Sequence, residues 1–196
     1  MRLILLGAPG SGKGTQGVIL ADHFDVDHIS SGELLRKAIA AGTPLGCDAE
    51  GYVLRGELVP DDLVLDLVTE STRNASRPNG YVLDGFPRTL AQAERAFARA
   101  VLAGATADAV VYLDVDDDTA RERLLARAVG RADDGNLGVI DNRLEVFHRE
   151  TQPLLDFYGD RGLLVTVDAT GAPEAVNKAM IDELTRLLQA SGQAST

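Results

Sequence analysis

Residues 7–13 form a sequence pattern that is typical of loops that bind phosphate groups. They read Gly-Ala-Pro-Gly-Ser-Gly-Lys, the Gly-x-x-x-x-Gly-Lys pattern of a phosphate-binding loop. Glycines let the backbone curl so that successive N–H groups converge on phosphate oxygens, and a following helix adds the positive end of its dipole. Lys13 supplies a full positive charge for the terminal phosphates. Because an apolar run precedes the loop and a helical stretch follows it, we favour a nucleotide-binding loop over a plain glycine-rich turn.

The residues after Lys13 depart from the general motif. Gly14 stands where Ser or Thr is usual, and Thr15 follows one position later. The hydroxyl group that usually binds Mg²⁺ directly is therefore displaced, and we expect Mg²⁺ to be held mainly by phosphates and water. Asp84, at the end of a buried strand, is a candidate to hold those waters, and a helix or turn cap is the alternative.

Five arginines are candidates for contact with phosphate oxygens. Phosphoryl transfer requires alignment and positive charge more than covalent chemistry, and a guanidinium group binds phosphate oxygens in pairs. An exposed arginine is usually a solvated surface charge, so each depends on its context. The candidates are Arg36, Arg88, Arg127, Arg131 and Arg143. Asp133 and Asp134 either pair with these arginines when a loop closes or are simply solvated.

Alternating strands and helices must position these residues. Short apolar runs predict five strands, at residues 2–6, 26–29, 80–83, 109–115 and 163–167. Strands that alternate with helical patterns imply right-handed βαβ units. We therefore predict an α/β fold, a P-loop three-layer sandwich in which a five-stranded parallel sheet is flanked by helices.

The helical patterns differ in strength. Ser30 to Glu33 has capping-box spacing and predicts a helix that continues to about residue 41. Residues 44–58 have a weak helical pattern, and a single long helix is predicted over residues 139–157. The segments 30–59 and 127–138 fit the layers least well. We expect one domain over residues 1–196, with these two segments as mobile flaps.

The composition narrows the classes of function. Hydrophobic residues make up 45% of the chain and charged residues 25%, which is ordinary for a globular protein. The 19 basic and 30 acidic residues give a net charge of −11, which opposes general binding to nucleic acid or to anionic membranes. An anionic ligand must therefore be held by a local cluster of Lys and Arg.

Cysteine content and hydropathy bear on metal sites and location. Cys47 is the single cysteine, which excludes an intramolecular disulfide and a cysteine-based zinc site, and we expect it to be buried or partly buried. The apolar start at residues 1–6 is too short for a signal peptide, and no stretch approaches the roughly 20 apolar residues of a spanning helix. These observations predict a cytoplasmic protein, with a monomer as the default.

Four blocks of sequence resemble those of adenylate kinases, and they occur in the right order. They are residues 7–16 (GAPGSGKGTQ), 29–36 (ISSGELLR), 84–89 (DGFPRT) and 130–134 (GRADD). Together they are specific for nucleoside monophosphate kinases and most similar to adenylate kinase. The resemblance implies the reaction Mg·ATP + AMP ⇌ 2 ADP, so ATP, AMP and ADP are the expected ligands. The short segment after Arg127 implies a short lid without zinc.

The resemblance also implies roles for individual residues. ATP is expected at Gly10, Ser11, Gly12, Lys13, Gly14, Thr15 and Arg127, with its adenine against the backbone near Gly171 or Ala172. AMP is expected at Ser31, Arg36, Glu57, Leu58, Val59, Gly85, Phe86, Pro87, Arg88 and Gln92, with the Gln92 amide on the base. Arg131 and Arg143 are expected to hold the phosphates during transfer. Segment 30–59 would be the flap over AMP and segment 127–138 the lid over ATP.

Two alternatives remain at this stage. A UMP/CMP kinase uses the same scaffold, and Ser31 stands where Thr is usual in adenylate kinases, although Gln92 and the Ser31 hydroxyl favour AMP. A nucleotide-binding regulator without catalysis would lack Lys13 or the arginines, and none of these is missing. An acceptor panel separates the first alternative, and disproportionation of ADP separates the second.

Overall fold

A parallel sheet organises the chain. The computed structural model describes residues 1–75, 79–127 and 136–193. Within these ranges five strands form one sheet in the order β2-β3-β1-β4-β5, and every adjacent pair is parallel. The strands are β1 (Arg2–Gly7), β2 (Asp27–Ser30), β3 (Tyr81–Asp84), β4 (Ala109–Asp114) and β5 (Leu164–Asp168). Each predicted strand is confirmed to within one residue at either end, and so is the α/β fold.

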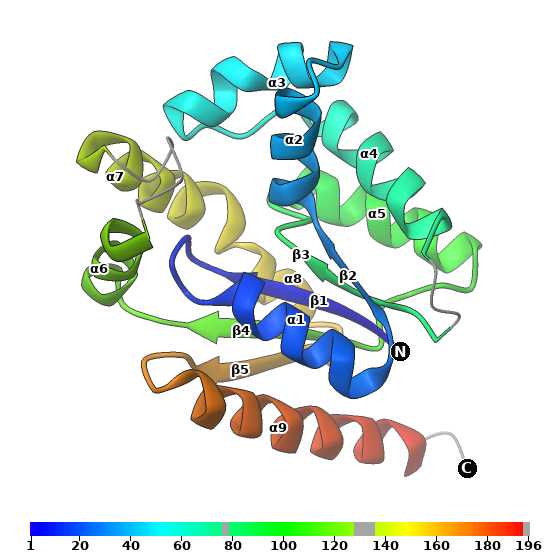
Figure 1. The fold of residues 1–196 in the computed structure, drawn as a ribbon. Coiled ribbons are helices and arrows are strands. Elements are labelled where there is room, and N and C mark those ends of the chain that lie inside the picture. Colours follow the sequence, from blue (N-terminus) through cyan, green and yellow to red (C-terminus); the bar gives the residue numbers. More distant parts are fainter. Residues whose placement is uncertain (76–78, 128–135, 194–196) are drawn as a thin grey trace.

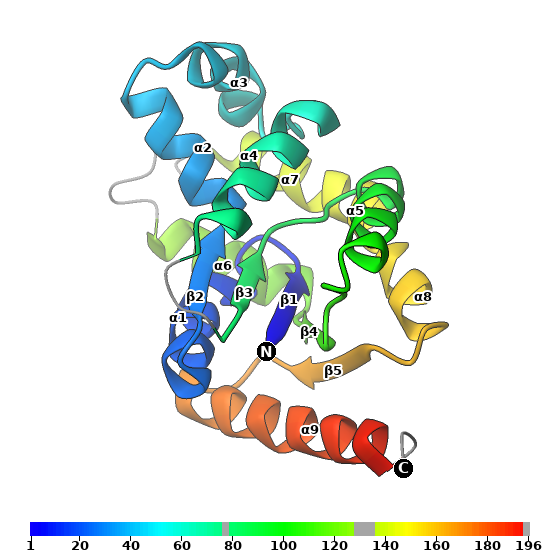
Figure 2. The same cartoon turned by 90° about the vertical axis from the view of Figure 1, so that its right-hand side faces the viewer.

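Helices cover both faces of the sheet (Figure 1). On one face α1 (Lys13–Phe24) and α9 (Pro173–Gln193) pack in a core that includes Leu5, Leu113 and Met180. On the other face α5 (Leu90–Leu102) and α8 (Leu154–Gly159) pack on β1 and β4 around Tyr158. Figure 2 shows the sheet between these two groups of helices, as predicted for a three-layer sandwich. None of the helices within the described ranges is long and apolar enough to cross a membrane.

Three further helices pack near the β2 edge. They are α2 (Ser31–Ala40), α3 (Pro44–Arg55) and α4 (Asp61–Arg73), and they share a second apolar core with β2 and β3. The predicted cap at Ser30 is confirmed, because its Oγ accepts a hydrogen bond from the Glu33 N–H at 3.4 Å. Thr43 caps α3 in the same way through the Gly46 N–H at 3.1 Å. A well-capped helix therefore forms where the sequence pattern was weak.

The expectation that Cys47 is buried or partly buried is wrong. Cys47 lies near the start of α3 and is exposed. The buried positions of α3 are Gly46 and Ala49, which face α2. Gly46 lies so close to the Ala38 carbonyl that a methyl group there would overlap it. Small residues therefore occupy the contact between α2 and α3, and the cysteine falls on the solvent side.

The single long helix predicted over residues 139–157 is wrong. Helix α6 (Asp117–Arg127) precedes this region, which contains α7 (Leu137–Val146), a π-helical turn η1 (Phe147–Thr151) and α8. The Gln152 N–H donates to the Phe147 carbonyl at 2.9 Å, an i to i−5 bond. Pro153 has no N–H group and its ring crowds the preceding turn, so a regular α-helix is disfavoured there. The π-helical turn and a new helix start resolve this conflict.

Candidate active site

A cleft of about 470 Å³ opens at the carboxyl ends of β1 and β3. Parallel strands place the loops that follow them at this edge of a sheet, where ligands of open α/β sheets bind. The lining includes Lys13 and four of the five predicted arginines, namely Arg36, Arg88, Arg127 and Arg143. Arg131 lies outside the described residues, as do Asp133 and Asp134. The fold thus gathers five cationic side chains from distant parts of an acidic chain.

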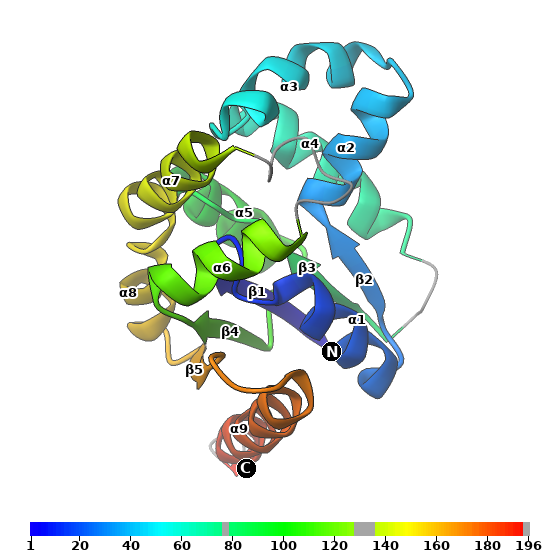
Figure 3. The same ribbon diagram turned by 60° about the vertical axis from the view of Figure 1, so that its left-hand side comes forward.

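The loop between β1 and α1 has the conformation that its glycines permit. Gly10 and Gly12 have φ values of 89° and 93°, in the left-handed region that other residues avoid. A methyl group at Gly10 would also overlap the carbonyl of Ala120 on α6, which lies beside the loop (Figure 3). The first turn of α1 begins at Lys13, so its backbone N–H groups point toward the cleft. The loop can therefore accept an anion at its helix end, and α6 supports it.

Lys13 is held against the loop itself. Its Nζ donates hydrogen bonds to the carbonyls of Gly7 at 2.7 Å and Ala8 at 2.8 Å, and lies 3.4 Å from Ser11 Oγ. Burial lowers the pKa of Lys13 to about 8, while the negative charge of Asp84 opposes this shift. Nearby guanidinium groups lower the pKa further. A bound polyphosphate would raise the pKa of Lys13 again, because its full negative charges favour the protonated amine more than carbonyl dipoles do.

Asp84 ends β3 and its side chain is buried at the base of the cleft. Burial alone would raise its pKa, but His28, Lys13 and Arg88 outweigh burial and the pKa is lowered. His28 Nε2 lies 3.7 Å from Asp84 Oδ2. Asp84 is therefore an ionised carboxylate close to Lys13 and Arg88.

The backbone of Arg88 is held on both sides. Its N–H donates to Gln92 Oε1 at 2.8 Å, and its carbonyl accepts from Thr151 Oγ1 at 2.8 Å. Its own side chain donates from Nε to the Gly85 carbonyl at 2.7 Å. Thr151, at the end of η1, was missed from the sequence because an α-helical register does not single it out. These contacts fix where the Arg88 guanidinium enters the cleft.

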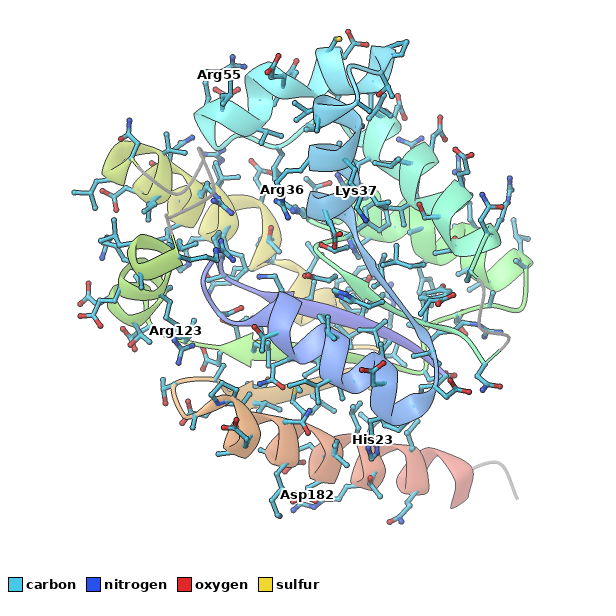
Figure 4. All side chains as sticks on the ribbon, in the orientation of Figure 1. His23, Arg36, Lys37, Arg55, Arg123 and Asp182 are labelled. Atoms are coloured by element: carbon cyan, nitrogen blue, oxygen red, sulfur yellow. The ribbon has the colours of Figure 1, made fainter. Side chains whose placement is uncertain are left out.

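Arg88 and Arg36 approach one another above Gly32. A methyl group at Gly32 would lie 3.3 Å from Arg36 Nη1 and 3.6 Å from Arg88 Nη2. Burial lowers the pKa of Arg88, Asp84 opposes this, and Arg143 and Arg36 reinforce it. Figure 4 shows Arg36 projecting from α2 toward the space above the phosphate-binding loop. Two guanidinium groups this close create a strong preference for a divalent anion such as a phosphate.

The remaining acceptor-side residues predicted from the sequence meet at the same place. Ser31 is 1% exposed and its Oγ donates to the Gly85 carbonyl at 2.6 Å. The cleft lining also includes Glu57, Leu58, Val59, Gly85, Pro87 and Gln92. Phe86 lies instead in the apolar core with Val59 and Leu83. The Glu57 carboxylate forms an ion pair with Arg55 at 2.8 Å, so the segment offers the cleft its backbone.

The residues predicted for the donor side lie in two places. Gly10, Gly12, Gly14, Thr15 and Arg127 line the cleft, while Ser11 is buried beneath the loop. Gly171 and Ala172 are exposed in the loop between β5 and α9 and are not among the residues that line the cleft. Two residues missed from the sequence hold this loop. Arg123 donates to the carbonyls of Ala169 at 2.8 Å and Thr170 at 2.9 Å, and Gln16 donates to that of Pro173 at 2.8 Å. Figure 4 places Arg123 between α6 and this loop.

Comparison with known proteins agrees with this geometry. The model of the family described as "Adenylate kinase" matches residues 5–163. The chain belongs to the adenylate kinase family. It is 49% identical over 175 residues to the adenylate kinase of Synechococcus sp. (strain WH7803), covering 89% of this chain and 93% of that protein. It is 44% identical over 184 residues to that of Corynebacterium glutamicum (strain R), covering 94% and 99%. It is 41% identical over 192 residues to that of Trichodesmium erythraeum (strain IMS101), covering 95% and 99%.

Membership of the adenylate kinase family confirms the predicted activity. The chain is a nucleoside monophosphate kinase that transfers a phosphoryl group reversibly from ATP to AMP and yields two ADP. An adenylate kinase has to hold two anionic nucleotides while excluding water from the transferred group. The cleft concentrates positive charge within a chain of net charge −11.

Proposed function

We propose that the cleft binds ATP and AMP with their phosphate chains end to end, and that Lys13 and Arg88 flank the transferred phosphoryl group. The observation that carries this proposal is the convergence of Lys13, Arg36, Arg88, Arg127 and Arg143 on one cleft. Phosphoryl transfer spreads negative charge over the oxygens of the transferred group, and positioned cations stabilise that charge. A general anion site would not require cations from both sides of the cleft.

On the donor side, the proposal assigns the ATP phosphates to the backbone N–H groups of residues 10–15 and to Lys13. Arg127, at the end of α6, also lines the cleft and is assigned to the same phosphates. The adenine of ATP would rest against the loop at Gly171 and Ala172. Arg123 and Gln16 support this assignment because they hold the loop by three carbonyl hydrogen bonds.

On the acceptor side, the proposal assigns the AMP phosphate to Arg36, Arg88 and Arg143. Ser31, Gly85, Phe86 and Pro87 form the wall behind it, with the backbone of residues 57–59 over the ribose and base. Gln92 would read the base. The 2% exposure of Gln92 supports this role, since a buried amide beside a cleft offers directed hydrogen bonds without competition from bulk water.

Closure would complete the site. The proposal treats residues 30–59 as the flap over AMP and residues 127–138, with Arg131, as the lid over ATP. Closing both segments excludes water, which would otherwise compete as the phosphoryl acceptor. Asn142 on α7 already donates to the Arg55 carbonyl at 2.8 Å, which links the flap helix α3 to the helix that carries Arg143.

Mg²⁺ fits the residues present if it is bound through the substrate. No group of three or more metal-ligating His, Cys, Asp or Glu side chains occurs in the part of the chain that the structure describes. Asp84 offers a buried, ionised carboxylate in the cleft, which suits a role in holding water molecules around the ion. Bound Mg²⁺ would neutralise charge on the ATP phosphates. The protein's part is then to orient the phosphates and the water.

Acceptor kinetics test this proposal. With Mg·ATP as donor, we expect kcat/KM for AMP to exceed that for CMP and UMP, and we expect the chain to disproportionate ADP alone into ATP and AMP. The Lys13→Ala variant serves as the control for contaminating kinases, because it should lose activity by orders of magnitude. A preference for UMP or CMP, or no turnover of ADP, would contradict the assignment. The monomeric state and cytoplasmic location stay predictions.

A further inference from the structure

The side-chain amide of Gln92 forms hydrogen bonds with two partners, one that can only accept and one that can only donate. Its Nε2 donates to Asp61 Oδ1 at 2.6 Å, and its Oε1 accepts from the Arg88 backbone N–H at 2.8 Å. A carboxylate can only accept hydrogen bonds, and a backbone N–H can only donate. Turning the amide over would oppose Oε1 to the carboxylate and Nε2 to the N–H group. Only one of the two amide orientations is therefore compatible with its surroundings.

The carboxylate that orients the amide lies outside the cleft. Gln92 is among the lining residues, whereas Asp61 is not among those that the structure describes there. Asp61 is the first residue of α4, and its second oxygen accepts from Thr89 Oγ1 at 3.2 Å. Thr89 in turn caps α5, the helix that carries Gln92. Asp61 is thus held at both oxygens and cannot turn away without losing both hydrogen bonds.

The held amide keeps a defined pattern of free hydrogen-bonding groups. A glutamine amide has two N–H groups and two oxygen lone pairs, and the two contacts use one of each. The remaining N–H and lone pair keep fixed positions, a donor on the Asp61 side and an acceptor on the Arg88 side. If the orientation were free, donor and acceptor could exchange places at little cost.

Nucleotide bases fall into two groups, amino bases and oxo bases, in which the donor and the acceptor occupy exchanged positions. Adenine presents an amino donor beside a ring-nitrogen acceptor, and cytosine presents the same pattern. Hypoxanthine, guanine and uracil present a carbonyl acceptor beside a ring N–H donor. An amide fixed in one orientation pairs with one pattern and opposes the other, and an opposed buried pair is left unsatisfied at high cost.

We propose that Asp61 is a positioning residue that fixes the Gln92 amide and thereby makes the acceptor site select amino bases over oxo bases. This rests on the proposed function, in which Gln92 reads the acceptor base. Asp61 touches no substrate and acts only through Gln92. Its loss therefore changes which base is accepted, and it leaves the donor site and the phosphate cations in place.

The sharpest test compares AMP with IMP, which differ only in the exchange of the amino group and ring nitrogen for a carbonyl and an N–H. The wild-type chain should prefer AMP. Asp61→Ala should lower the AMP-to-IMP ratio of kcat/KM by about tenfold, the effect of one charge-assisted hydrogen bond. Asp61→Asn should retain most of the preference, because its amide can still accept from Gln92 and donate to Thr89. The KM for ATP should stay within about twofold in each variant.

Asp62→Ala is the matched control. Asp62 is the next residue of α4 and joins the same two helices through an ion pair with Arg95 at 2.7 Å, but it does not contact Gln92. We expect its AMP-to-IMP ratio to equal that of the wild type. If Asp61→Ala does not fold, Asp61→Ser removes the same contact and suits a first helical turn. The ratio does not depend on the fraction of active enzyme, so partial unfolding does not disturb it.

The outcomes separate this inference from the proposed function. A ratio that is unchanged in Asp61→Ala and Asp61→Ser, or that falls equally in Asp62→Ala, overturns the role of Asp61. A wild-type chain that uses AMP and IMP equally also overturns it. A wild-type chain that prefers UMP or CMP to AMP overturns the proposed function, whatever the variants do.

Discussion

Nucleotide binding should be coupled to the uptake of a proton by Lys13. Burial, reinforced by nearby guanidinium groups, lowers its pKa to about 8, against 10.5 for an ordinary lysine. A bound polyphosphate favours the charged amine and raises this pKa again. At pH 8 about half of the free molecules carry a neutral Lys13, and at pH 9 about nine-tenths do. Binding of Mg·ATP should therefore take up about 0.5 proton at pH 8 and about 0.9 proton at pH 9.

The sign of the linkage fixes the dependence of affinity on pH. Because the free protein loses this proton near pH 8 and the complex retains it, affinity for Mg·ATP falls as pH rises through that value. The expected loss between pH 7 and pH 9 is about tenfold, which equals about 1.4 kcal/mol. Lys13 lies only partly exposed at the end of the loop, so solvent reduces this effect little.

Isothermal titration calorimetry in buffers of different ionisation enthalpy measures the proton uptake directly. At pH 8 and above, phosphate groups with a second pKa near 6 are fully ionised and contribute nothing. Lys13→Arg is the control, since a guanidinium with a pKa above about 12 remains charged throughout. An uptake below about 0.1 proton at pH 9, or equal uptake by Lys13→Arg, would show that Lys13 does not take up the proton.

Three further results are expected from single substitutions. Arg88→Ala should lower kcat/KM by roughly 10²–10³-fold and raise the KM for AMP, measured by coupled assay, because positioned charge is lost. Near-normal turnover would mean that Arg88 only supports the fold. Gly46→Ala should lower the free energy of unfolding by roughly 1–3 kcal/mol through overlap with the Ala38 carbonyl, measured by urea denaturation. Gly159→Ala, with only an ordinary contact to Leu164, is its control and should change stability by less than about 1 kcal/mol. Arg123→Ala should raise the KM for ATP roughly tenfold and leave that for AMP unchanged, since it frees the loop before α9. Equal changes in both KM values would show a general loss of structure instead.

The sheet was predictable because its strands carry their own signal. Buried parallel strands are short apolar runs, and those at β1 and β4 differ from the structure by one residue at most. The helix start at Ser30 was predictable in the same way, because the capping hydrogen bond between Ser30 and Glu33 is local in the sequence. The phosphate-binding loop was predictable for the same reason, since glycine conformation and the position of Lys13 are local properties.

Features that depend on distant partners were not predictable. Pro153 could be seen in the sequence, but whether the chain there breaks, kinks or forms a π-helical turn depends on packing against other elements. The exposure of Cys47 depends on which face of α3 packs against α2. Gly46 lies on that face, against the Ala38 carbonyl, and Cys47 does not. The pairing of Asp61 with Gln92 joins residues 31 positions apart, and no pattern along the chain records it.

The π-helical turn constrains how this protein can change length. This turn holds one residue more than an α-helical turn and absorbs it locally, so losing that residue would leave the following segment near its present orientation. A helix advances about 100° per residue, so inserting a further residue between Phe147 and Thr151 would rotate all that follows by about that angle. Thr151 would then turn away from the Arg88 carbonyl, and Leu154 and Tyr158 would leave the apolar layer that they fill on the sheet. This segment should therefore tolerate the loss of one residue better than the gain of one.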